Sequence, residues 1–349
     1  MNIRIPMTAI SIPAACALCL AVLVHPAHGQ EEQTKPRGAH GYDNLRIEQE
    51  DRLSAPVEKA EEIWQFMQKH FVEDQSWIKQ LDPEFTANFS AEDFTDTYFD
   101  TSTLQALAGA HGIRYRRRLN LTNPNDRKSG RELLQIKISD ISGDALQRGE
   151  IKFEIDRRSN MNTREDRHPM IGLVRPAHRE GLRTRLADLG MDAETMRPIL
   201  TIQDRRTRVY ILKDGKPFMS ISHDKARSEL LWAKFEMVEI EPELNEIAYT
   251  EAGPETRAYM EKIGAAISAR MRQEFPYLEQ NLTPKYNRAF AAFEEQIPYL
   301  RLLVKTNMIN QDHLFALIFA LVAGIGYTVY RSHRALADRK HRRVSMAGA

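Results

Sequence analysis

Hydrophobic and polar residues alternate in short runs through the middle of the chain, with turn residues between the runs. Successive side chains of a strand point to opposite faces of its sheet, so this alternation predicts strands with one polar and one apolar face. The runs are 45–53, 94–99, 112–119, 131–139, 149–156, 199–213, 218–224 and 233–241. Several short strands separated by turns indicate a sandwich or a barrel.

Other segments show helical spacing instead: 57–71, 176–189, 255–275 and a stretch that begins at 283–284. Ser54 and Pro56 suit the start of the first helix, as a cap and a proline in the first turn. Pro298 is expected to break or kink the last helix. We therefore predict a mostly β fold with flanking helices (α+β), in which residues 251–312 form a helical stalk or pack on the strands.

The N-terminal region is typical of a secretory signal. Arg4 precedes an uncharged, largely apolar run at 14–24, and Ala27 and Gly29 are the small residues that a signal peptidase requires. We predict a signal peptide at 1–29 and a flexible leader at 30–42; an uncleaved anchor is the alternative. The only cysteines, Cys16 and Cys19, lie in the apolar run. A chain cut after residue 29 therefore has no disulfide and no thiolate chemistry.

A second uncharged stretch, at 314–330, is followed by a cluster of five arginines and one lysine. As a helix it is about 25 Å long, near the short limit for crossing a bilayer, and a basic flank marks the cytoplasmic side. We predict a transmembrane helix at 313–331 and a basic cytoplasmic tail at 332–349; a buried core helix is the alternative. The main domain would then lie on the periplasmic side of the cytoplasmic membrane. Ala316, Ala320 and Gly324 are spaced for a homodimer through this helix.

The overall composition limits the function classes. The chain is 28% charged and 42% hydrophobic, with a net charge of +1. It has enough apolar residues for one large core, and its neutral balance argues against a nucleic-acid partner. The sequence has no H-E-x-x-H spacing, no glycine-rich G-K-[ST] loop and no G-x-S-x-G elbow, and we expect His111 and His223 to be surface or sheet residues.

Charged residues occupy one face of most predicted strands. They include Glu48, Glu50, Arg52, Arg114, Arg116, Arg118, Lys137, Glu150, Lys152, Glu154, Arg206, Arg208, Asp224, Glu239 and Glu241. If this face lies inside a barrel, the basic side chains can hold phosphate oxygens and the carboxylates Mg²⁺ or Mn²⁺. If it lies outside, it is an ordinary solvated face. Periodicity leaves both alternatives open.

These motifs, in this order, resemble the triphosphate tunnel superfamily, the CYTH and VTC-like polyphosphate-polymerase group. The quoted elements are EQEDR at 48–52, TYFDTSTLQAL at 97–107, IRYRRR at 113–118, LLQIK at 133–137, RGEIKFE at 148–154 and the strands from 199 to 241. The resemblance covers about residues 45–245, so we place the tunnel domain at 43–250. It implies an antiparallel β-barrel of the triphosphate tunnel type, followed by C-terminal helices and one transmembrane helix.

By this resemblance, the roles of the charged residues fall into three sets. Phosphate would be bound by Arg114, Arg116, Lys137, Arg206 and Arg208. A metal, Mg²⁺ or Mn²⁺, would be bound by Glu48, Glu50, Asp224, Glu239 and Glu241. Glu150 and Glu154 would orient water or bind metal, and Arg52 would stand near the reacting phosphoryl group.

Three departures from the family pattern affect the expected activity. Arg52 replaces the usual lysine, the last strand offers only Glu239 and Glu241 in phase where many relatives have three acidic residues, and 157–190 is hard to align. Nucleoside triphosphates are scarce outside the cytoplasmic membrane, so we expect metal-dependent hydrolysis of triphosphate or polyphosphate ends by a membrane-tethered phosphoanhydride hydrolase. The alternatives are a non-catalytic polyphosphate or polyanion receptor and a VTC-like polyphosphate-handling enzyme.

Overall fold

The structure is a computed structural model of the 349-residue chain. It describes residues 46–123, 125, 130–139, 147–156, 163–309, 322–332 and 334, all within one compact unit, Arg37–Ala349. The predicted signal peptide (1–29) and leader (30–42) lie outside the described residues, as does most of the predicted tail (332–349).

Ten strands form one sheet in which every pairing is antiparallel. The strands are β1 (Arg46–Gln49), β2 (Leu53–Ala55), β3 (Phe85–Asp100), β4 (Gly112–Asn120), β5 (Glu132–Ser139), β6 (Gln147–Glu154), β7 (Arg197–Lys213), β8 (Lys216–Leu230), β9 (Ala233–Leu244) and β10 (Glu279–Gln280). Their order is β1-β6-β5-β4-β3-β7-β8-β9-β2-β10. Each of the strands β3 to β9 overlaps one of the seven runs predicted between 94 and 241, but β3 begins nine residues before its run and β8 ends six residues after its run.

The prediction of a closed barrel is wrong, because the sheet is open, with β1 at one edge and β10 at the other. β1 pairs with β6, and β2 pairs with β9 and β10. Between β1 and β2 the chain makes one isolated bridge, Glu50 to Glu243, instead of a continuous ladder. Alternation determines on which face of the sheet a side chain lies but not which strands pair. The sequence pattern therefore does not show whether the sheet closes into a barrel.

In the part of the chain that the structure describes, no helix is long and apolar enough to cross a bilayer. This finding overturns the predicted transmembrane helix at 313–331 and, with it, the predicted single-pass location in the cytoplasmic membrane. Residues 313–321 themselves lie outside the described residues. The stretch that carried the prediction is near the lower length limit for spanning.

The helices are α1 (Ala60–Met67), α2 (Ser76–Leu81), α3 (Gln105–Ala108), α4 (Pro176–Asp188), α5 (Glu246–Glu251), α6 (Pro254–Glu274), α7 (Lys285–Gln296) and α8 (Leu300–Lys305). Short turns of 3₁₀- or π-helix stand at Val57–Lys59, Gln68–Glu73, Ile171–Leu173 and Ala193–Thr195. α1 and α6 share one apolar cluster, which includes Ile63, Ile263 and the β7 residue Val209. α4 packs in another cluster, through Leu182 and Leu186 on Phe153 of β6.

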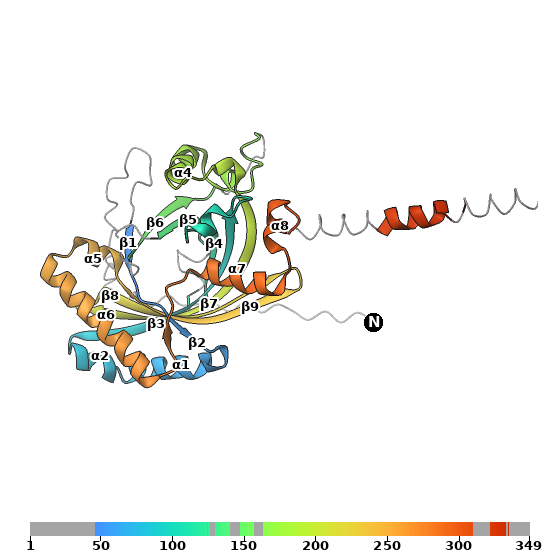
Figure 1. Ribbon diagram of the computed structural model, residues 1–349. Helices are drawn as coiled ribbons and strands as arrows, with labels where there is room; N and C mark the ends of the chain where they lie inside the picture. The colour runs from blue at the N-terminus through green and yellow to red at the C-terminus, as the bar shows by residue number, and fades with distance from the viewer. Residues whose placement is uncertain are drawn as a thin grey trace, which may run out of the picture. The chain divides into compact units, whose positions relative to one another are not determined.

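The helix α7 packs on the charged face of the sheet, inside the curve of the strands, whereas α6 lies outside it (Figure 1). Phe290 and Phe293 of α7 share an apolar cluster with the sheet residues Ile202, Leu230 and Met237. These three sheet residues have the same strand parity as the charged side chains, so the charged face has an apolar end. By covering that end, α7 brings its own first turn against the charged residues.

Candidate functional site

The charged face predicted from strand parity is buried. Its members with at most 9% of their surface exposed are Glu48, Glu50, Arg52, Glu92, Asp96, Arg114, Arg116, Arg148, Glu150, Asp204, Arg206, Asp224, Glu239 and Glu241. Charged groups are almost never buried to this degree unless they are paired. Burial therefore excludes the alternative of an ordinary solvated face and directs attention to the pairing.

Several of the predicted phosphate-binding arginines already hold carboxylates. Arg116 donates through Nε and Nη2 to the two oxygens of Asp96, at 2.7 and 2.6 Å, and Arg114 donates to Asp96 at 3.1 Å. Burial alone would raise the pKa of Asp96, but Arg114 and Arg116 outweigh it and lower that pKa to about 2. Arg206 is bonded in the same bidentate way to Asp224 and also donates to Glu241, at 2.6 Å. These guanidinium groups are therefore paired within the protein, Arg114 and Arg116 with one shared carboxylate.

The other two predicted phosphate ligands lie toward β1. Lys137 donates to Glu48 at 2.6 Å, and its side chain keeps 18% of its surface exposed. Arg208 donates to Ser222 at 2.8 Å, and its Nη2 lies 3.6 Å from Glu243. Of the two predicted catalytic glutamates, Glu150 is buried on the charged face. Glu154 instead stands at the end of β6, 29% exposed, paired with Arg175.

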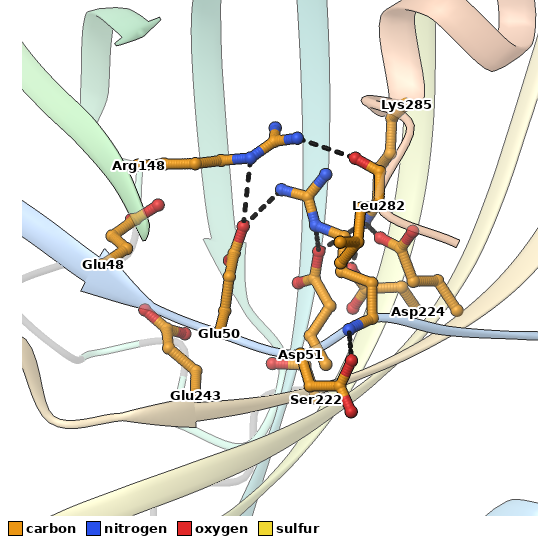
Figure 2. Close-up of polar contacts among 12 residues, drawn as sticks. Glu48, Glu50, Asp51, Arg148, Ser222, Asp224, Glu243, Leu282 and Lys285 are labelled. Atoms are coloured by element: carbon orange, nitrogen blue, oxygen red, sulfur yellow. Dashed lines mark hydrogen bonds and ion pairs between the residues drawn. The ribbon is translucent and has the colours of Figure 1, made fainter. Parts of the chain in front are cut away.

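The predicted metal ligands divide into two groups. The Asp224 group comprises Asp224, Glu239 and Glu241, and the Glu48 group comprises Glu48, Glu150 and Glu246 of α5. Within each group, one carboxylate oxygen per residue lies within 4.8 Å of the others. Glu50 belongs to neither group; it pairs with Arg52, and its Oε1 lies 3.7 Å from Nε of Arg148 (Figure 2).

The Glu48 group suits a divalent cation. Its three carboxylates offer the oxygen ligands that Mg²⁺ and Mn²⁺ prefer. The ammonium groups that pair with them belong to Lys137 and Lys152, whose side chains are 18% and 27% exposed. Both lysines therefore have solvent into which they can move when a cation binds.

The Asp224 group does not suit a metal as it stands, because Lys285 of α7 occupies it. The ammonium nitrogen donates to Asp224 and, at 2.9 Å, to Asp204; it lies 3.4 Å from Glu239 and 4.0 Å from Glu241. Lys285 was absent from the sequence prediction, because the docking of a helix onto the charged face leaves no local sequence signal.

Glu243 supplies the third acidic residue that the last strand seemed to lack. It follows Glu239 and Glu241 in phase on β9, and its carboxylate lies near those of Glu48 and Glu50 (Figure 2). The predicted run ended at 241, and Pro242 follows it; proline is rare inside strands. The strand nevertheless continues to Leu244, so this departure from the family pattern is removed.

Three arginines lie together on this face, and the sequence analysis predicted a role for only one of them, Arg52. We call Arg52, Arg148 and Arg288 the arginine trio. Burial, and next the charge of Arg52, lower the pKa of Arg148. Burial and the charges of Arg52 and Arg148 lower the pKa of Arg288 to about 10, against an opposing effect of Tyr98. Arg52 pairs with Glu50 and Arg288 with Glu239, but Nε and Nη1 of Arg52 and Nε of Arg288 are buried without a hydrogen-bond acceptor. Guanidinium groups in this state attract an anion.

Glu243 provides a pH prediction. Burial raises its pKa to about 7, against 4.5 ordinarily, with Glu48 and Glu50 adding to the shift and Arg208 opposing it. Between pH 4.5 and 7 the unfolded chain loses this proton while the folded chain keeps it, so stability falls as pH rises. We expect Glu243→Gln to remove this cost and to raise the free energy of unfolding at pH 8 by about 2 kcal/mol, allowing for a 19% exposed side chain.

Urea denaturation in EDTA at pH 4.5 and pH 8 measures this effect. The matched control is Glu236→Gln on the same strand, where the side chain is exposed. A Glu243→Gln variant that gains no more at pH 8 than at pH 4.5, or no more than the control, contradicts the prediction.

Comparison with known proteins gives the following. No protein-family model and no curated protein matches the chain. Solved structures that are similar include a candidate adenylate cyclase from Bacillus halodurans, at 14% identity and a TM-score of 0.41, over 70% of this chain and 98% of that one. A candidate adenylyl cyclase from Hippeastrum with a dominant triphosphatase activity is 16% identical, with a TM-score of 0.40, over 73% and 98%. The RNA triphosphatase Pct1 of S. pombe is 12% identical, with a TM-score of 0.29, over 73% and 84%.

Two of these descriptions name a triphosphatase activity of the protein described. Neither the VTC-like group nor a membrane anchor is shown by them. Because each identity is below 25% and each TM-score below 0.5, these likenesses assign neither a family nor an activity to this chain. The functional proposal therefore depends on the side chains of the charged face.

Proposed function

We propose that the charged face binds inorganic triphosphate or the end of a polyphosphate chain and hydrolyses a phosphoanhydride bond with the help of Mg²⁺ or Mn²⁺. The observation that carries this proposal is the arginine trio. Its three guanidinium groups repel one another, two of them have buried donors without acceptors, and they share the face with the Glu48 group. Phosphate oxygens are the ligands that such donors bind best.

We assign different roles in this reaction to different residues of the charged face. The arginine trio holds phosphate oxygens and orients the chain of phosphates. The Glu48 group would hold the divalent ion, which when bound supplies charge neutralisation at the phosphoryl oxygens. Such reactions depend mainly on positioning and on the stabilisation of negative charge.

Besides its place in the Glu48 group, Glu150 is the residue that we assign to the orientation of water. Its carboxylate accepts a hydrogen bond from Gln135 at 3.1 Å and pairs with Lys152. Burial would raise the pKa of Glu150, but Lys152 and Lys137 outweigh burial and lower it. Glu150 is therefore ionised at neutral pH and can accept a hydrogen bond from an attacking water.

The test is phosphate release by the purified full-length chain from triphosphate, polyphosphate and ATP, with Mg²⁺, with Mn²⁺ and with EDTA. We expect metal-dependent release that falls about 100-fold in Glu150→Gln. Arg148→Met should raise KM about 10-fold or more, since it removes a charge-assisted contact with phosphate. Arg227→Met, an exposed arginine on β8, is the matched control and should change neither quantity.

A second function has its own support: binding of polyphosphate without catalysis. Arg114, Arg116 and Arg206 are paired with carboxylates, and Lys285 fills one of the two acidic groups. This arrangement leaves fewer arginines free to bind phosphate and fewer carboxylates free to bind a metal. If the wild type releases no phosphate but binds polyphosphate, and Arg148→Met weakens that binding, the hydrolase proposal fails and the binding function replaces it.

A further inference from the structure

The first turn of α7 brings a lysine into a position that a metal ion would otherwise take. Lys285 is 7% exposed, and four carboxylates surround its ammonium group, those of Asp204, Asp224, Glu239 and Glu241. Burial lowers the pKa of Lys285, but Asp204, Asp224 and Glu241 outweigh burial and raise it. The ammonium group is therefore charged at neutral pH.

The three residues that follow Lys285 each contact another part of the chain. Tyr286 stacks on Tyr98 of β3, with ring centroids 5.1 Å apart and planes 5° apart, and its hydroxyl donates to Asp100 at 3.0 Å. Asn287 donates to the carbonyl oxygen of Leu107 at 2.8 Å. One residue further, Arg288 donates to Ser54 at 2.9 Å and pairs with Glu239. Lys285 is thus held in place by its neighbours and does not rest on the carboxylates alone.

The local charge balance is almost complete without a metal. Arg206, Lys285 and Arg288 bring three positive charges to the four carboxylates, and Arg52, which also pairs with Glu50, brings a fourth to Glu241. A divalent ion added to this set would need space that the ammonium group fills, and it would leave an excess of positive charge. Removing the lysine would leave several carboxylate oxygens in a buried site with too little positive charge, which is the condition in which carboxylates bind a divalent cation.

We propose that Lys285 is a built-in cation that closes the Asp224 group to divalent metals, so that the chain takes its metal at the Glu48 group alone. This inference rests on the proposed function only in that it assigns the metal of that reaction to one site. It predicts that a metal site is latent in the Asp224 group and opens when the ammonium group is removed.

The experiment counts Mn²⁺ bound to the full-length chain, by calorimetry and by the electron paramagnetic resonance of free Mn²⁺, without any phosphate substrate. We expect Lys285→Met to bind one more Mn²⁺ per chain than the wild type and to gain more thermal stability from Mn²⁺. Lys285→Arg keeps the positive charge and should bind no additional ion. Lys262→Met, an exposed lysine of α6, is the matched control.

Because Lys285→Met leaves four carboxylates short of one cation, a second variant protects the test against a failure to fold. Lys285→Met combined with Asp204→Asn removes one charge of each sign and leaves the Asp224 group intact. An unchanged Mn²⁺ count in both variants, with no additional stabilisation by Mn²⁺, overturns the proposal. A gain of one ion supports it even if the wild type releases no phosphate, so the two proposals fail separately.

Discussion

Replacing Asp100 with alanine is expected to lower the free energy of unfolding by about 4 kcal/mol. Asp100 belongs to the YFDT motif and has no exposed surface. Its carboxylate accepts hydrogen bonds from the backbone N–H groups of Thr101, Ala106 and Leu107, at 2.7, 2.8 and 2.9 Å. It also accepts the hydroxyl of Tyr286. Alanine would leave these donors around α3 without an acceptor and would remove the hydrogen bond of Tyr286 from the first turn of α7.

Chemical denaturation of the variant measures this loss. Asp100→Asn retains one acceptor oxygen and should lose about half as much. Asp93→Ala is the matched control on the same strand, because Asp93 is 37% exposed and pairs with Arg205 on the outer face. An exposed ion pair contributes about 1 kcal/mol at most. If Asp100→Ala and Asp93→Ala lose the same amount, the motif aspartate does not organise this corner of the fold.

Arg206→Met is expected to cost about 3–5 kcal/mol of stability at pH 7, since it removes one partner from a buried ionic network. The side chain of Arg206 is 8% exposed and pairs with Asp224 and Glu241. Burial would raise the pKa of Asp224, but Arg206 and Lys285 outweigh it and lower that pKa, and Glu241 is shifted in the same direction. Such groups add stability above their unfolded pKa and lose it as pH falls.

The pH profile separates this electrostatic cost from a packing defect. The deficit of Arg206→Met should be largest near pH 7 and should narrow below pH 4, where the wild type loses the same contribution. Arg205→Met is the adjacent control on β7; its side chain is 58% exposed, so we expect a change within about 1 kcal/mol. A deficit that stays constant from pH 7 to pH 3 would show that the guanidinium group acts through packing alone.

The sequence predicted the strands and their faces because alternation is a local property. Arg206 and Glu239 lie on the buried charged face as parity required, and Asp96 and Asp204 lie in phase with them, so the same rule would have identified both. Pairing across the face is not local. No periodicity reveals that Arg116 meets Asp96 and not a phosphate.

Two errors have separate physical causes. Closure of the sheet depends on how residues 50–52, between β1 and β2, pair with β9, and no alternation pattern encodes that pairing. Lys285 was overlooked because it starts a helix whose position is set by the apolar end of the charged face, through Phe290 and Phe293. The sequence marks the start of that helix, but the surface on which a helix packs depends on the folded sheet.

The pairing partners of β1 and β2 affect the order in which the chain can fold. Arg46 pairs with Glu150, and Leu53 pairs with Ile240, so the first strands of the described chain find their neighbours only after most of the sequence is present. Contacts of such long sequence separation form slowly. Glu48, Glu50 and Arg52 lie on this segment, so the charged face has its full set of residues only once the first strands have paired with β6 and β9.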